Sequence, residues 1–268
     1  MGIKVAVCSY DRPEACRDQT LACLKKVKWP ASDIYVFVAN DAEYARYKKV
    51  LPRELYGHLV VGKLGLGNQK KFMSRYFPEG EEIVYMHDDV RRIVYRHQVG
   101  VKVFDRDVPD FPRYARWAFK VCRQHGLRLW GMRMSANPLF LRPTATIGWL
   151  LIGGPVYGEI NTRSKSFQAR PDGVQEDVER TLQYIHADGN VLRLNLLGLK
   201  TRWHGPGGLQ SVHSFEARRK IELARGKLLE KKYGKYLKSV TVGRPPHPVD
   251  FKFHVSPTRV VIPMPTFT

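Results

Sequence analysis

Short apolar runs and longer amphipathic stretches alternate along the N-terminal third of the chain. The apolar runs, which are typical of buried strands, lie at residues 3–10, 34–40, 59–65 and 82–87. The amphipathic stretches between them have helical spacing and lie at residues 13–27, 42–51 and 68–77. Pro13 suits the first turn of the first helix. This alternation predicts an α/β fold with a mostly parallel sheet and right-handed crossovers.

The pattern after residue 95 is less regular and mixes helices with strands. Helices are expected at residues 111–126, 175–189 and 215–237, and the last of these is strongly basic. A strand and turn are expected at 129–141, one buried strand with a glycine break at 146–160, and a pair of strands at 191–203. We predict one composite domain at residues 1–238, with halves at 1–95 and 96–238, followed by an extended proline-rich tail at 239–268 that wraps the surface.

Polar residues follow each of the four predicted N-terminal strands. They are Ser9 and Tyr10, Asn40 and Asp41, Gly65 to Asn68, and His87 with Asp88 and Asp89. Ligands of parallel α/β sheets bind in the crevice outside the carboxyl ends of the strands. The sequence therefore predicts that these residues converge on one edge of the sheet and form the site there.

The adjacent carboxylates Asp88 and Asp89 end the fourth strand. Mg²⁺ and Mn²⁺ prefer oxygen ligands and are often held by one or two carboxylates together with substrate phosphates. If the strand continues, the two side chains alternate, and one of them faces the metal. The alternative is a turn with solvated acids flanked by Arg91 and Arg92.

The glycine-rich segment before residue 68 matches neither of the common phosphate-binding motifs. Gly65 and Gly67 begin the dinucleotide-binding pattern, but its third glycine is missing, and no Gly-Lys-Ser/Thr follows. Asn68, Lys70 and Lys71 at the start of a helix are still suited to facing a nucleotide, because helix N-termini bind anions.

Two candidate groups for catalysis lie in the second half. Glu176 and Asp177 occupy the first turn of a predicted helix, where acids are favoured by the helix dipole alone; one of them is alternatively a general base. His204 lies in a glycine-rich loop, either as an ordinary polar loop residue or as a ligand of a metal or phosphate.

The charge balance favours an anionic partner. The chain has 45 basic and 25 acidic residues and a net charge of +20. Nucleic acid is the leading partner, because neutralising phosphates releases counterions; a generally cationic surface is the alternative.

The four cysteines form no CxxC or zinc pattern. No apolar stretch is long enough to span a membrane, and the N-terminus does not look like a signal peptide, so we expect a cytoplasmic protein (in the host cell, if the protein is viral) without a membrane partner.

The order of these segments resembles that of GT-A nucleotide-sugar glycosyltransferases. More narrowly, the chain resembles the TET-associated glycosyltransferases of phages, which add sugar to hydroxymethylated pyrimidines in DNA. The matching segments span about Val5 to Ser211 and are "CSYDRPE", "VFVANDAEY", "GLGNQKKF", "IVYMHDDV", "WGMRMSANPLFL", "LLIGGPVYGEI", "QEDVERTLQYIHADGNVLR" and "GPGGLQS". The resemblance implies a GT-A-like, Rossmann-like sheet flanked by helices, a smaller mixed acceptor-side region and a basic C-terminal helix.

The resemblance also implies roles for the matching residues. On the donor side these are Ser9, Tyr10 and Arg12 (uracil and ribose), Asp41 (base), Asn68 and Lys71 (ribose or phosphates) and Asp88 (sugar or ribose). For the metal they are Asp89 and His204, and for the acceptor and its activation they are Gly153, Gly154, Asp177 as base and Glu176 beside it. The family motif usually opens with a carboxylate where this chain has His87, which puts that contact in doubt.

The function implied is a metal-dependent inverting transfer of glucose or N-acetylglucosamine from a UDP-sugar, with Mn²⁺ or Mg²⁺, to a 5-hydroxymethylpyrimidine in double-stranded DNA, most often 5-hydroxymethylcytosine. Three alternatives remain open. They are a glycosyltransferase of the same fold with a non-DNA acceptor, a metal-dependent nuclease or nucleotidyltransferase that uses Asp88 and Asp89, and a non-catalytic DNA-binding module.

Overall fold

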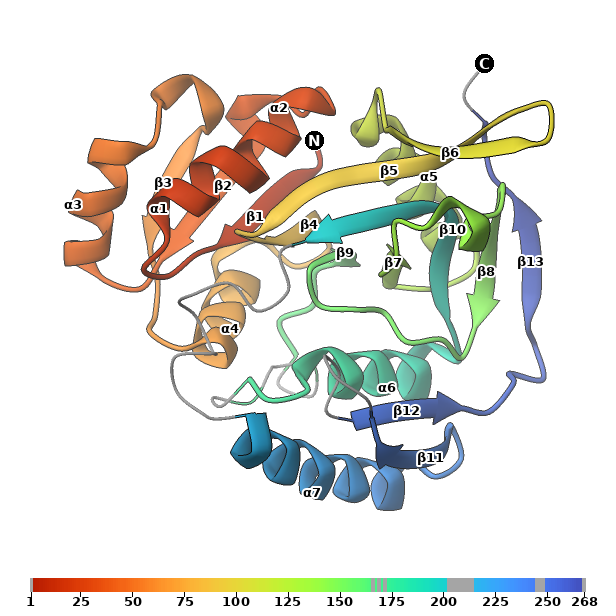
Figure 1. Cartoon of the computed structure of the whole chain (residues 1–268). Coiled ribbons are helices and arrows are strands. Elements are labelled where there is room, and N and C mark those ends of the chain that lie inside the picture. The colour runs from red at the N-terminus through yellow and green to blue at the C-terminus, as the bar shows by residue number, and fades with distance from the viewer. Residues whose placement is uncertain are drawn as a thin grey trace.

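One large sheet with helices on both faces organises the molecule (Figure 1). The structure is a computed structural model that describes residues 2–164, 167, 170, 173–201, 215–243 and 249–266. Among these residues, eleven strands form the main sheet, in the order β13-β8-β10-β7-β9-β4-β1-β2-β3 with β5 and β6 attached through β10, and two further strands form a small second sheet.

The first four strands run parallel to one another, as the sequence pattern predicts. They are β3 (His58–Val61), β2 (Ile34–Val38), β1 (Lys4–Cys8) and β4 (Glu82–His87). The helical segments between them are α1 (Pro13–Ala15), a π-helical turn (Cys16–Leu21), α2 (Ala22–Lys26), α3 (Asp41–Val50) and α4 (Leu66–Tyr76). Since the strands are parallel, their carboxyl ends meet at one edge of the sheet.

The rest of the sheet is mixed. Its strands are β5 (Val90–Val99), β6 (Lys102–Asp107), β7 (Leu129–Arg133), β8 (Thr144–Gly148), β9 (Val156–Ile160) and β10 (Val191–Thr201). β9 is antiparallel to both β4 and β7, whereas β10 is parallel to β7. Helices α5 (Phe111–Gln124) and α6 (Glu176–Asp188) pack on this part.

Two predictions about the second half are wrong. The segment predicted as a strand pair at 191–203 is the single strand β10, whose first half pairs with β8 and second half with β5; a register shift takes the place of the expected turn. The segment predicted as one broken strand at 146–160 is two strands, β8 and β9, because the chain leaves the sheet between them.

The C-terminal part builds further structure. Helix α7 (Phe215–Tyr233) ends earlier than predicted, and β11 (Leu237–Val242) pairs with β12 (Val249–Phe253). The last strand, β13 (Val260–Pro263), pairs with β8 at the edge of the main sheet. Where it is described, the proline-rich region is extended, and it contributes hydrogen-bonded strands to both sheets.

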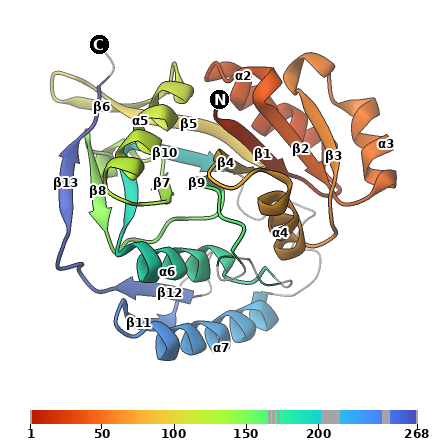
Figure 2. The same cartoon turned by 180° about the vertical axis from the view of Figure 1, so that it is seen from behind.

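The two faces of the sheet have separate cores because alternate residues of a strand point to opposite sides. Val84 of β4 packs with residues of α2 and α5, while its neighbour Tyr85 packs with residues of α4, α6 and α7. In both views α4, α6 and α7 lie below the sheet (Figure 1, Figure 2). Within the part of the chain that the structure describes, no helix has the length and apolar character of a membrane span.

Candidate active site

Asp88 and Asp89 form the two-residue turn between β4 and β5. Asp88 is only 1% exposed; its Oδ2 accepts a 2.6 Å hydrogen bond from the Ser9 hydroxyl, and its Oδ1 accepts a 2.5 Å bond from the Arg12 guanidinium. Burial raises the pKa of Asp88 to about 6, although Arg12 opposes the shift. Both oxygens of Asp88 are therefore engaged by the loop that follows β1.

Asp89, by contrast, keeps a free oxygen. Its side chain is partly buried, and Oδ1 has no hydrogen-bond partner among the described residues. A buried carboxylate oxygen without a donor fits a hard cation such as Mg²⁺ or Mn²⁺, which takes one or two protein carboxylates and completes its shell with phosphates and water. The described residues contain no group of three acidic, histidine or cysteine side chains placed to hold a metal. His204, the other predicted ligand, lies outside the described residues.

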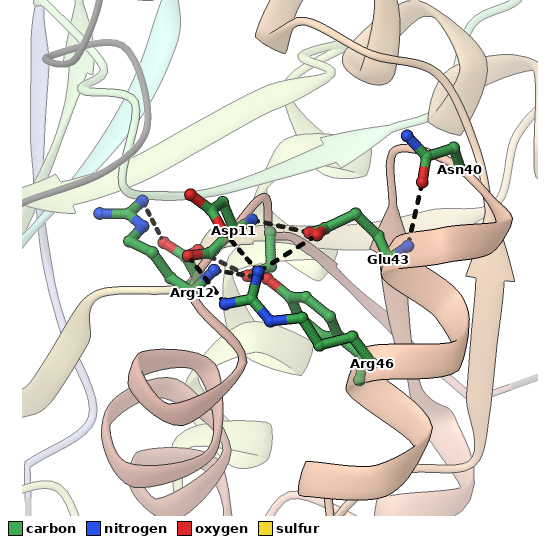
Figure 3. Close-up of polar contacts among 8 residues, drawn as sticks. Asp11, Arg12, Asn40, Glu43 and Arg46 are labelled. Atoms are coloured by element: carbon green, nitrogen blue, oxygen red, sulfur yellow. Dashed lines mark hydrogen bonds and ion pairs between the residues drawn. The ribbon is translucent and has the colours of Figure 1, made fainter.

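Helix α3 holds the loop after β1 in place (Figure 3). The Tyr47 hydroxyl lies 2.6 Å from the Ser9 hydroxyl and accepts a 3.1 Å bond from the Arg12 backbone N–H. Asp11 has a left-handed backbone, with φ of 57°; its N–H donates to Glu43 at 2.7 Å, and its carboxylate pairs with Arg46. These contacts aim Ser9 and Arg12 at Asp88.

Removing the Tyr47 hydroxyl tests this arrangement. Tyr47→Phe keeps the buried ring but leaves the Ser9 hydroxyl and the Arg12 N–H without this partner, so we expect the free energy of unfolding to fall by about 1–3 kcal/mol. Urea denaturation measures the change. The matched control is Tyr44→Phe on the same helix, whose ring is only partly buried. An equal effect of both substitutions would contradict a special role for the Tyr47 hydroxyl.

The other predicted donor contacts lie further out. Tyr10, Asp41 and Asn68 are exposed, and Asn68 donates to the Leu64 carbonyl at 3.1 Å. Lys71 is half-buried in the side of α4. These residues surround the carboxyl ends of β1, β2 and β3, and their contacts with a nucleotide stay predictions.

The start of α6 is fixed by a buried ion-pair cluster. Glu176 lies between Lys70 of α4, with which it pairs, and Arg180, whose guanidinium donates to it at 2.6 Å. Arg180 also stacks over the Tyr157 ring, with its Cζ 3.5 Å from the ring centroid. Burial alone would raise the pKa of Glu176, but Arg180 and Lys70 more than offset this and lower it. Both oxygens of Glu176 are thus engaged.

Gly154 lies where this cluster meets the Asp88–Asp89 turn. A Cβ at Gly154 would be 3.2 Å from Glu176 Oε1, 3.5 Å from His87 Cε1 and 3.7 Å from Asp177 Cβ. Burial, followed by the charge of Glu176, raises the pKa of Asp177, and its Oδ1 accepts a 2.9 Å bond from the Val178 N–H. The end of β4 and the start of α6, which are distant in sequence, are therefore neighbours across a glycine.

His87 is the residue that stands in for the expected carboxylate. Burial, aided by the charge of Lys70, lowers its pKa to about 3, so its ring is neutral. Its Nε2 is buried and has no partner within the described part of the chain. The contact that a carboxylate would make at this position is replaced by an uncharged imidazole facing Gly154.

Sequence patterns missed most of the buried cluster. Arg180 follows Glu176 by one helical turn, a spacing that signals an ion pair on one helix. Lys70 and Tyr157 come from distant segments, and the local sequence pattern does not predict that they lie near Glu176. Lys70 was grouped with Asn68 and Lys71 as facing a nucleotide, whereas its ammonium is buried against α6.

Glu159 of β9 lines a small cavity, of about 30 Å³, beside this cluster. Burial raises the pKa of Glu159 to about 7, and Arg180 only partly opposes the shift. A raised carboxyl pKa stabilises the folded state at low pH, and this contribution is lost as the pH rises through the folded-state value. Protonated Glu159 is therefore the form that the interior favours.

A pH series checks this assignment. Between about pH 5 and pH 8 we expect the free energy of unfolding to fall by about 1–3 kcal/mol through Glu159, because its carboxyl ionises in a buried place. Glu159→Gln should remove this part of the pH dependence of the free energy of unfolding, as measured by urea denaturation. Glu82→Gln, whose side chain pairs with Arg123 on the surface, is the control that keeps the wild-type slope. A slope equal in wild type and Glu159→Gln contradicts the assignment.

Comparison with known proteins places the fold. No family model matches the sequence, and no curated protein matches it. Among solved structures, TarS 1–349 from S. aureus in complex with UDP-GlcNAc has a TM-score of 0.51 and 14% identity, covering 86% of this chain and 67% of that chain. Glucosyl-3-phosphoglycerate synthase from Mycobacterium tuberculosis, in complex with Mn²⁺, UDP-glucose and phosphoglyceric acid, has a TM-score of 0.50 and 13% identity, covering 98% and 89%. A mycobacterial protein has a TM-score of 0.52 and 11% identity, covering 96% and 84%.

The likeness is one of architecture, namely a large, partly parallel sheet flanked by helices. The chain has the mixed α/β fold of GT-A-type nucleotide-sugar glycosyltransferases.

Proposed function

We propose that the protein is a glycosyltransferase that uses a UDP-sugar. The observation that carries the proposal is the meeting, across Gly154, of the Asp88–Asp89 turn with the start of α6 on a GT-A-type fold. One side offers a free carboxylate oxygen at the strand ends, and the other offers Asp177, whose raised pKa suits a proton acceptor. The similar structures from S. aureus and M. tuberculosis hold UDP-GlcNAc and UDP-glucose respectively.

On the donor side, Asp89 would hold Mn²⁺ or Mg²⁺, with His204 as a second ligand. When bound, the cation supplies positive charge that neutralises the departing diphosphate. Ser9 and Arg12 keep Asp88 ionised and oriented beside it. Tyr10 and Asp41 are proposed to bind the base and Asn68 and Lys71 the ribose or phosphates, while Asp88, with both oxygens engaged, orients Ser9 and Arg12 beside them.

On the acceptor side, Asp177 would take the proton of the acceptor hydroxyl. Glu176 does not suit this task, because Lys70 and Arg180 occupy both of its oxygens; it orients the first turn of α6. Gly153 and Gly154 leave room for the acceptor because they carry no side chains. A base on the face opposite the leaving group gives direct displacement with inversion at the anomeric carbon.

The acceptor is proposed to be a 5-hydroxymethylpyrimidine in DNA. The support is the net charge of +20 and a set of exposed lysines on and after α7, namely Lys220, Lys231, Lys232, Lys235 and Lys238. Exposed lysines suit contacts to phosphates, which position DNA without specifying its sequence. A two-metal nuclease is disfavoured because Ser9 and Arg12 already engage both oxygens of Asp88.

The test is incubation with radiolabelled UDP-glucose or UDP-N-acetylglucosamine, with and without Mn²⁺. Acceptors are unmodified DNA and DNA with 5-hydroxymethylcytosine or 5-hydroxymethyluracil. We expect label in the hydroxymethylated DNA only, and only with the metal. Label in none of the DNAs contradicts the DNA acceptor, while label in unmodified DNA contradicts the modified base. Release of nucleotides from the DNA itself would favour the nuclease.

A further inference from the structure

Two arginines, Arg133 and Arg193, lie on neighbouring strands and on the face of the sheet that carries α6. Arg193 of β10 is paired in register with Gly131 of β7 and with Thr146 of β8, and Arg133 follows Gly131 by two residues on the same face. The residues that alternate with them, such as Met132 and Leu194, belong to the core on the opposite face. The side chains of Arg133 and Arg193 therefore point to the α6 side of the sheet.

Two more arginines complete this group, which we call the arginine cluster (Arg133, Arg142, Arg193 and Arg259). Arg259 precedes β13, and its Cγ would lie 3.5 Å from a Cβ at Gly148, two residues along β8 from Thr146. Arg142 donates its backbone N–H to the Asn195 carbonyl of β10. β13, β8 and β10 lie next to one another (Figure 1). Arg133 and Arg193 are half-buried at the centre of the cluster, and Arg142 and Arg259 are exposed at its rim.

The arginines of the cluster lower one another's pKa values. Burial and the charges of Arg133 and Arg259 lower the pKa of Arg193 to about 10. Burial and the charge of Arg142 lower the pKa of Arg133. Each cation thus lies close enough to another to disfavour its charge. Holding like charges together in a partly buried place costs folding free energy unless an anion joins them.

The anion is missing from the described part of the chain. There, none of the four arginines forms an ion pair with a carboxylate, and the Nε of Arg133 is buried without a hydrogen-bond partner. Arg193 donates only a 3.3 Å bond to the Asn195 side chain. Four other buried or part-buried arginines, namely Arg12, Arg92, Arg128 and Arg180, each pair with a carboxylate, whereas Arg96 donates to the Leu141 carbonyl and the Gln98 side chain. Outside the described residues the sequence holds a single acidic side chain, Asp172.

The cluster adjoins the acceptor side of the candidate active site. A Cβ at Gly131, which pairs in register with Arg193, would lie 2.6 Å from Ile152 Cγ2, and Gly153 follows Ile152. Gly154, the next residue, is the neighbour of Asp177. We infer that the arginine cluster binds a phosphate group and, on the basis of the proposed function, that this phosphate belongs to the acceptor. Arginine suits the task because its guanidinium donates two parallel hydrogen bonds to a phosphate.

Binding of inorganic phosphate and pyrophosphate tests the site without any sugar transfer. The variant is Arg133→Gln/Arg193→Gln, and the matched control is Arg113→Gln/Arg116→Gln, which removes the same charge from the exposed side of α5 on the opposite face. Calorimetry should show phosphate binding weakened about tenfold or more in the first variant and little changed in the control, since charge-assisted bonds to phosphate are lost. Arg259→Gln, a change at an exposed side chain, should weaken binding by a smaller factor and guards against misfolding of the double variant.

Two further measurements separate the possible sources of the phosphate. UDP should bind the first variant as tightly as wild type, because the donor diphosphate belongs to the Asp89 side; a parallel loss of UDP binding overturns the acceptor assignment. If the phosphate belongs to DNA, a short DNA duplex should compete with inorganic phosphate for the cluster. If it belongs to a small phosphorylated acceptor, that acceptor should compete and the duplex should not. Equal phosphate binding by wild type, variant and control overturns the inference. If only the first variant loses phosphate binding and the protein transfers no sugar, the phosphate site is supported and the proposed function is contradicted.

Discussion

Asp177→Asn is expected to lower the rate of sugar transfer by about 10²–10⁴-fold, the usual contribution of a general base. The asparagine keeps the size of the side chain and can still accept from the Val178 N–H, but it cannot take a proton. Affinity for UDP should stay near the wild-type value, because Asp177 lies on the acceptor side of Gly154. Steady-state rates at saturating UDP-sugar, together with calorimetric binding of UDP, measure both quantities.

The matched control is Glu179→Gln on the same helix, which removes an ion pair with Arg170 and no group at Gly154. Its rate should stay within a few-fold of wild type, because Glu179 makes no contact at Gly154. An Asp177→Asn variant that is folded, binds UDP and transfers sugar at the wild-type rate would remove Asp177 from the mechanism.

Arg180→Met is expected to lower the free energy of unfolding by about 3–5 kcal/mol, because it leaves Glu176 buried with one cation in place of two. The substitution also removes the donor to the Ile152 carbonyl and the stack on Tyr157. Urea denaturation of the variant against wild type gives the change directly. Transfer activity should fall along with stability, since α6 carries Asp177.

A double-mutant cycle identifies the cause. Glu176→Gln/Arg180→Met no longer buries an unbalanced carboxylate and should recover part of the loss. Arg123→Met, which breaks a more exposed pair with Glu82, should change stability by less than about 1 kcal/mol. Equal losses for Arg180→Met and Arg123→Met would show that the buried cluster does not hold α6.

The first half of the fold follows from the sequence because its signals are local. Apolar runs such as Ile34–Val38 have the length and β-branched content of buried strands, and the stretches between them are amphipathic. The hairpin of β5 and β6 has no clear sequence signal, because β6 (Lys102–Asp107) is mostly charged and none of its residues is fully buried. The sequence predicts two strands at 191–203, whereas β10 is one strand that changes partners midway, a feature that only the tertiary arrangement decides.

The strand-end rule predicts where a site should lie, but it does not predict the individual contacts there. The resemblance implies that Ser9 and Arg12 contact the uracil and ribose; their bonds to Asp88 are not predicted by the sequence. A buried carboxylate needs donors, and the loop after β1 is the segment close enough to supply them. The pairing of Lys70 with Glu176 cannot be predicted from the local pattern, because the two residues are distant in the sequence.

The central claim is that Asp89, through a divalent cation, holds the diphosphate of a UDP-sugar at the end of β4. Calorimetric titration of UDP into wild type and Asp89→Asn, each with and without Mn²⁺, tests it most directly. The account predicts that Mn²⁺ tightens UDP binding to wild type by about tenfold or more and that Asp89→Asn loses this gain, since a ligand of the cation is removed. A wild-type protein that does not bind UDP, or an Asp89→Asn variant with the same metal-dependent gain, would contradict it.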